Sequence, residues 1–220
     1  KVGTDSQGRK AAENSTAVGG NLSSLIQDYP WVVDQWPNGS FPPGLGDFGQ
    51  TPYTDTHSEF GFNNVNTYTF NSILSLEYKI PGIEGLKFSA YANFNYENLE
   101  QKVFRNTWEV YDYNAASDQY TAVSQGYYNI SLGGITGQGG TKKLADANNF
   151  SRGNLYHTQV SYVKSFGKHR INGFVAYEQS SNDTSLLAAY RRDLPTVEMP
   201  YLFSGGQTGK DNNGYVTEGG

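Results

Sequence analysis

The feature that most constrains the fold is a two-residue alternation in residues 67–80, which read TYTFNSILSLEYKI. The even-numbered positions are apolar except for Ser72, and the odd-numbered positions are polar except for Ile73. Successive side chains of a β-strand point to opposite faces, so this pattern predicts a strand with two different surroundings. The apolar face can contact a protein core, with the polar face in bulk water. It can instead contact lipid, with the polar face turned toward a wet lumen.

Three further segments alternate in the same way, and short turns join them in pairs. They are residues 86–97, 155–166 and 169–180. The first turn is rich in Pro and Gly, and the second is the dipeptide Gly167-Lys168. Such spacing predicts two antiparallel hairpins, over residues 67–97 and 154–180. We call the alternate positions that are mostly apolar the apolar phase of a strand, and the positions between them its polar phase. The alternation is weakest in the last segment, because Phe174 and Ala176 lie on its polar phase.

The connections alternate between long and short along the chain. Residues 1–66, 98–153 and 181–220 are long, and the two hairpin turns are short. One rim of the sheet therefore carries tight turns and the other carries large loops, as in outer-membrane barrels with short periplasmic turns. We expect an all-β fold, namely an antiparallel up-and-down transmembrane β-barrel segment in which these three long regions are extracellular loops. Within them we expect a short helix near residues 22–27 and a small hairpin around residues 114–118.

Aromatic residues lie at both ends of the apolar faces of these strands. Tyr78 and Phe166 lie near the short turns, whereas Tyr68, Phe70, Phe94, Tyr96 and Tyr156 lie near the long loops. This placement predicts two aromatic girdles around an apolar band. The alternative is that Tyr and Phe are common in strands of any kind.

Composition argues against several classes of function. A formal net charge of −5 without a basic cluster argues against a nucleic-acid partner. The chain has no cysteine, which excludes thiolate metal sites, and its 3 histidines are scattered without ligand spacing. It also has no apolar run of the length of about 18 residues that a membrane-spanning helix needs. We therefore expect no enzymatic activity, no cofactor and no metal.

The candidate binding residues fall into two groups. Aromatic side chains in the long loops could contact a substrate or a lid protein, because they offer large rigid contact area. The alternative is that they pack the loops on themselves. These residues are Trp31, Trp36, Trp108, Tyr111, Tyr113, Tyr120, Tyr127 and Tyr128. The candidate lumen-facing residues are Asn71, Ser75, Glu77, Asn93, Asn95, His157 and Gln159.

Both hairpins resemble those of the SusC/RagA-like TonB-dependent transporters of the Bacteroidetes outer membrane. The resemblance rests on LEYKIPGIEGLKFSAYANFNYEN (76–98), SYVKSFGKHRINGFVAYEQSS (161–181) and the loop QDYPWVVDQWPNGSF (27–41). It implies a barrel that imports oligosaccharides or other large nutrients, peptides included, with a SusD-like lipoprotein and the TonB complex as partners. No plug or TonB box is recognisable, so we expect a fragment of the barrel region, which would reach the TonB complex through other parts of the protein. The alternative is a soluble, aromatic-rich β-domain that binds carbohydrate.

Overall fold

The structure is a computed structural model that describes residues 33–43, 51–132, 135–137, 140–198, 200–207 and 212–219. The helix expected near residues 22–27 and the candidate residue Trp31 lie outside these ranges. The fold is all-β, with antiparallel up-and-down sheets, as the alternating segments predict. Within the described ranges, no helix is long and apolar enough to cross a membrane.

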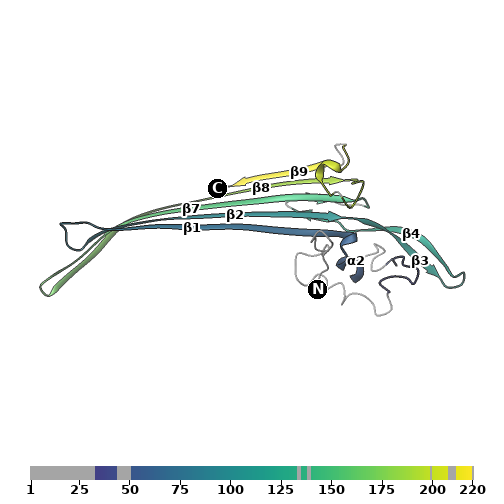
Figure 1. Cartoon of the computed structure of the whole chain (residues 1–220), viewed down its shortest axis with the longest axis horizontal. Helices are drawn as coiled ribbons and strands as arrows, with labels where there is room; N and C mark the ends of the chain where they lie inside the picture. The colour runs from purple at the N-terminus through teal and green to yellow at the C-terminus, as the bar shows by residue number, and fades with distance from the viewer. Residues whose placement is uncertain are drawn as a thin grey trace. The chain divides into compact units, whose positions relative to one another are not determined.

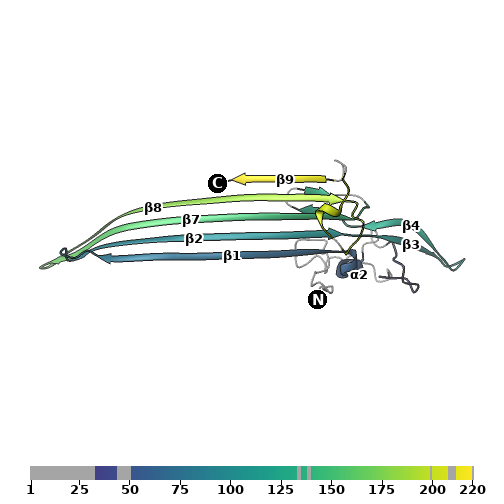
Figure 2. The same cartoon turned by 45° about the horizontal axis from the view of Figure 1, so that its top comes forward.

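Five strands form the main sheet, in the order β1-β2-β7-β8-β9 (Figures 1 and 2). They are β1 (Gly61–Lys79), β2 (Leu86–Arg105), β7 (Lys143–Phe166), β8 (His169–Arg192) and β9 (Asn212–Gly219). The two predicted hairpins are β1-β2 and β7-β8, which lie side by side in this order. The described strands form an open sheet with β1 and β9 at its edges, and they do not close a barrel.

The strands extend further than the alternation predicts. Strand β2 continues to Arg105, β7 begins at Lys143, and β8 continues to Arg192, so parts of the predicted loop regions are strand. Strand β9 also lies in a region that we expected to be loop. The extensions lack a two-residue pattern because side chains on both faces are buried there. Residues 103–105 and 143–145, for example, are buried in succession.

Two small hairpins occupy the connection between β2 and β7. The first joins β3 (Thr107–Asn114) and β4 (Gln119–Tyr127), and it is the hairpin expected around residues 114–118. Tyr113 pairs with Tyr120, and a register shift follows Val110. The second joins β5 (Ile130–Leu132) and β6 (Ile135–Gly137).

Short helical elements precede β1 and follow β8. Helix α2 (Pro52–Thr56) begins with a capping box, in which the side chains of Thr51 and Thr54 each accept a hydrogen bond from the other's backbone N–H. The 3-10 helices are η2 (Ser58–Phe60) and η3 (Leu202–Ser204).

The chain divides into two compact units, which differ sharply in burial. Unit 1 comprises Lys1–Asn66, Glu100–Asn148 and Leu187–Val216, and unit 2 comprises Thr67–Leu99, Asn149–Leu186 and Thr217–Gly220. Unit 1 has an apolar core in two clusters, centred on Trp108 and on Phe104. In unit 2, no residue whose burial is described (67–99 and 149–186) is buried. The alternating strands therefore form a single sheet layer in which both faces are accessible.

Candidate functional site

Three of the predicted loop aromatics form a cluster in unit 1. The ring centroid of Trp36 lies 5.8 Å from that of Tyr113 and 6.1 Å from that of Tyr120. The two tyrosine rings are 4.9 Å apart because they are directly opposed on β3 and β4. The three rings together form an aromatic surface on the β3-β4 hairpin, with Tyr113 38% exposed.

Backbone contacts hold Trp36 against the hairpin. The indole Nε1 donates to the backbone oxygen of Tyr111 over 2.8 Å, and the Tyr111 N–H donates to the oxygen of Phe41 over 2.8 Å. Between these contacts the chain turns at Gly39, whose φ of 84° favours glycine. The turn is closed by a 2.8 Å hydrogen bond from the Trp36 N–H to the Ser40 oxygen. The segment 33–43 is thus fixed to β3 by both side-chain and backbone hydrogen bonds.

Two tyrosine hydroxyls on this hairpin donate to carboxylates. The Tyr113 hydroxyl donates to Asp118 over 2.9 Å, and the Tyr111 hydroxyl donates to Glu109. These hydrogen bonds, and then the negative charges of the carboxylates, raise the pKa of both phenols above the usual value of 10. Both hydroxyls therefore remain neutral hydrogen-bond donors at physiological pH.

Trp108 and Tyr128 belong to the core of unit 1. Their side chains are buried, and their ring centroids are 5.4 Å apart. Phe60 packs edge-on against Trp108, and the Tyr128 hydroxyl lies 2.8 Å from the hydroxyl of Thr54. Their position matches the packing alternative and leaves them no accessible face for a ligand.

Tyr127 contacts a buried lysine in unit 1. The Lys143 ammonium lies 5.0 Å from the centroid of the Tyr127 ring and donates to the backbone oxygen of Tyr128 over 2.8 Å. Burial, and then the positive charge of Arg105, lowers the pKa of Lys143 to about 8. Sequence reasoning did not identify Lys143, because it lies in a glycine-rich region without periodicity.

In unit 2, side chains on the polar phases of neighbouring strands contact one another. The His157 ring stacks on Tyr91 at 4.8 Å, and its Nδ1 lies 3.1 Å from a carboxylate oxygen of Glu178. The Lys87 ammonium lies 3.3 Å from a carboxylate oxygen of Glu77. Tyr91 and Glu178 were missing from the predicted set, although their positions on the polar phase could have identified them.

A polar groove of about 460 Å³ lies in the same unit. It brings together two predicted residues, Asn71 and Asn95, with polar side chains from β1, β2, β7 and β8. Its lining is Thr69, Asn71, Asn95, Tyr96, Glu97, Ser151, Gly153 and Asn182. Ser75, Asn93 and Gln159 lie on the polar phase but do not line this groove.

The apolar phases of the same strands are widely exposed. Leu74 is 64% exposed and Val175 is 78% exposed. Two contacts between aromatic rings on this phase lie midway along β2 and in the first two thirds of β7, and so not at the ends of these strands. Phe94 packs on Tyr156 at 5.8 Å, and Tyr96 packs on Phe150 at 4.9 Å, both edge-on.

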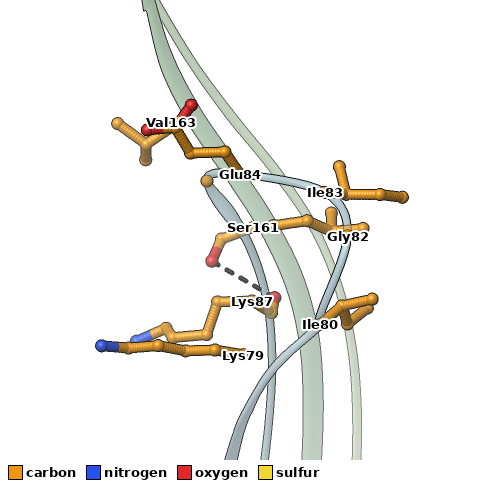
Figure 3. A pocket seen from close by; sticks show the side chains of 10 residues that line it. Lys79, Ile80, Gly82, Ile83, Glu84, Lys87, Ser161 and Val163 are labelled. Carbon is orange, nitrogen blue, oxygen red and sulfur yellow. Dashed lines mark hydrogen bonds between the residues drawn. The ribbon is translucent and has the colours of Figure 1, made fainter.

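The turn between β1 and β2 lies over β7 and forms a second cavity in unit 2, of about 740 Å³ (Figure 3). The Val163 N–H donates to the Gly85 oxygen over 2.8 Å, which holds the turn in place. Lys79 and Lys87 extend to one side of the turn, and Ile80 and Ile83 lie on the other (Figure 3). The cavity is therefore amphipathic.

The described residues contain no group of three or more His, Asp or Glu side chains that could hold a metal ion. Comparisons with protein-family models and with curated proteins find no match to this chain.

Proposed function

We propose that this chain is part of a TonB-dependent, SusC-like outer-membrane transporter that imports oligosaccharides or other large nutrients, peptides included. Its partners would be a SusD-like surface lipoprotein, the TonB complex and the lipid of the outer membrane. The observation that carries the proposal is the exposure of the apolar phase of unit 2. In that unit, apolar side chains of four adjacent strands are accessible on one sheet layer.

Exposed apolar surface of this extent is unfavourable in water and favourable in lipid. Each exposed Leu or Val side chain that moves from water to an apolar environment gains about 1.5–3 kcal/mol. Contiguous apolar patches of this kind mark contacts with membranes or other proteins. A strand that is apolar toward lipid and polar toward a lumen is the pattern of outer-membrane barrels.

The polar phase is suited to a water-filled lumen. Its residues contact one another across strands, as in the His157–Glu178 and Lys87–Glu77 pairs, and the polar groove adds amide and hydroxyl groups. These groups can form hydrogen bonds with water, with a polar substrate, or with a protein segment inside the lumen.

The aromatic cluster of Trp36, Tyr113 and Tyr120 supports a binding role for the β3-β4 hairpin and the segment 33–43 that contacts it. Aromatic faces stack on the apolar faces of sugar rings or on peptide side chains, and the phenols add polar tips. We propose that this cluster contacts the substrate or the surface lipoprotein.

A pair of arginine substitutions in the whole protein tests which face meets lipid. Leu74→Arg places a charge on the apolar phase, and we expect it to cost about 2–4 kcal/mol of stability in vesicles, as at a bilayer midplane. Ser75→Arg, on the polar phase of the same strand, is the matched control and is expected to cost much less. The measurement is the free energy of unfolding in urea, with the protein refolded into phospholipid vesicles. Equal costs for the two variants would refute the lipid assignment.

A second candidate is a soluble, aromatic-rich β-domain that binds carbohydrate. The buried core of unit 1, together with the aromatic cluster on its surface, favours this function. It predicts a monomer that unfolds cooperatively without detergent. The transporter proposal predicts aggregation under the same conditions, so size-exclusion chromatography with and without detergent separates the two.

A further inference from the structure

Two ion pairs in unit 2 involve residues of the apolar phase of β7. Arg152 contacts one carboxylate oxygen of Asp183, through Nη2 at 2.8 Å and Nε at 3.3 Å. Lys164 lies 3.8 Å from a carboxylate oxygen of Glu84, which comes from the turn that lies over β7 (Figure 3). Both cations are on even-numbered positions, the phase that also carries Tyr156 and Val160.

The stretch between these two cations carries no Lys, Arg, Asp or Glu. Residues 153–163 read GNLYHTQVSYV, and their single histidine, His157, lies on the polar phase. On β8, the residues from Ile171 to Ser181 that share the phase of Val175 are likewise free of acidic and basic groups, and His169 and Asp183 lie at the two ends of this stretch. The charges on this face of β7 and β8 are therefore confined to the two ends of an uncharged band.

The length of this band matches the thickness of a bilayer. Lys164 follows Arg152 by twelve residues on one strand, which corresponds to about 40 Å along the strand. At the tilt of about 45° of a membrane-spanning strand, the rise across the membrane becomes about 28 Å, close to the roughly 25 Å band of outer-membrane barrels.

We propose that Arg152 and Lys164 bind the phosphates of lipid headgroups, one at each edge of the apolar band. This inference rests on the proposed membrane function and adds the depth at which the sheet sits and the lipid groups that it contacts. The guanidinium has five N–H donors in a planar fork that matches phosphate, and Asp183 contacts two of its nitrogens.

The surroundings of Lys164 also suit the membrane interface. Its ammonium lies 5.6 Å from the centroid of the Phe166 ring, and aromatic rings gather at the headgroup level of membranes. A lysine near the end of a spanning segment reaches the headgroups with its long side chain while its stem stays against apolar surface. Glu84 and Asp183 act as positioning residues, because each holds a cation at an edge of the band.

A depth measurement in vesicles tests the position of the band. This chain has no cysteine, so a single cysteine substitution along β7 gives a site for a nitroxide label that is unique within this chain. We expect the immersion depth at positions 154, 156, 158, 160 and 162 to peak at 158, midway between the two cations. Positions 157, 159 and 161, on the polar phase, are the controls and are expected to stay water-accessible. A flat, fully aqueous profile on both phases would refute the membrane function itself. An immersed profile whose maximum lies at either end would refute only the present inference.

A headgroup measurement tests the phosphate contacts. For the whole protein in phosphatidylcholine vesicles, we expect phosphatidylglycerol to raise the midpoint of thermal unfolding. The double variant Arg152→Gln/Lys164→Gln is expected to lose at least half of this rise. Arg170→Gln removes a charge from the polar phase near the short turns and is expected to keep the full rise. The proposal is overturned if the double variant keeps the rise. It is also overturned if inorganic phosphate, added to the protein in detergent, reproduces the rise, because the site then binds free anions.

Discussion

Gly85→Ala is the substitution whose cost the structure defines best. Gly85 has a φ of 88°, which L-residues rarely adopt, and a Cβ atom at this position would overlap the carbonyl of Val163. The same residue accepts the 2.8 Å hydrogen bond from the Val163 N–H that holds the turn over β7. An added methyl group must therefore displace the turn and break this contact.

The expected cost is the sum of two effects. A left-handed backbone with a Cβ atom costs about 1–2 kcal/mol, and loss of a hydrogen bond costs about 0.5–1.5 kcal/mol. We therefore expect Gly85→Ala to lower the free energy of unfolding by about 2–3 kcal/mol. Gly82→Ala is the matched control, because Gly82 has a φ of 86° in the same turn and nothing within 4 Å of the added Cβ atom. It should cost only the backbone contribution, about 1–2 kcal/mol.

Urea unfolding of the whole protein in vesicles measures both variants. The quantity of interest is the difference between them, because the backbone strain is shared and cancels. A difference of about 1 kcal/mol agrees with contact between the turn and β7. Identical free energies of unfolding would mean that the turn does not lie on β7 and that the reasoning is wrong.

Three further predictions concern unit 1. Tyr128→Phe removes the 2.8 Å contact with Thr54 in the core, and we expect urea unfolding to show a loss of about 1 kcal/mol. The free energy of unfolding of unit 1 should rise between pH 8 and about 10.5. In this range Lys143 still carries its proton in the unfolded chain but has lost it in the folded chain, where the side chain is buried. Lys143→Met should abolish this rise in the pH dependence of unfolding. Trp36→Ala should weaken oligosaccharide binding roughly tenfold in calorimetry, a change of about 1.4 kcal/mol, and unchanged affinity would exclude the aromatic cluster from the binding surface.

The sequence predicts the hairpins of unit 2 well. Strands β2 and β8 begin at Leu86 and His169, where the alternation predicts them to begin. The small hairpin expected around residues 114–118 is also present, with Tyr111 opposite Ala122 and Tyr113 opposite Tyr120. These elements were predictable because a two-residue alternation or a flanking turn depends only on residues that are close together in the sequence. Prediction therefore succeeds where each strand has two chemically different faces.

The core of unit 1 was not predictable in this way. Val103 and Phe104 are adjacent in sequence and both buried, so the alternation that marks a strand is absent where both faces of the strand are buried. Trp108 and Trp36 lie in similar polar contexts, yet the first is buried and the second is half-exposed. That difference depends on partners such as Phe60, which is distant in sequence, so local patterns carry no information about it.

The two faces of the sheet in unit 2 differ in polarity but not in burial. This difference indicates what kind of medium contacts each face. An antiparallel sheet in water normally covers its apolar face and solvates only the polar one. Here Leu74 and Leu76 on one phase are exposed, and so are Asn71 and Glu77 on the other. A sheet layer with this arrangement suits two different media, one on each side. The location of the charges on β7 and β8 agrees. Among the described residues of these strands, the ion pairs on the apolar phase lie at its two ends, whereas the His157–Glu178 pair lies midway along the polar phase. The two media that we propose, lipid on one side and water on the other, would account for both observations.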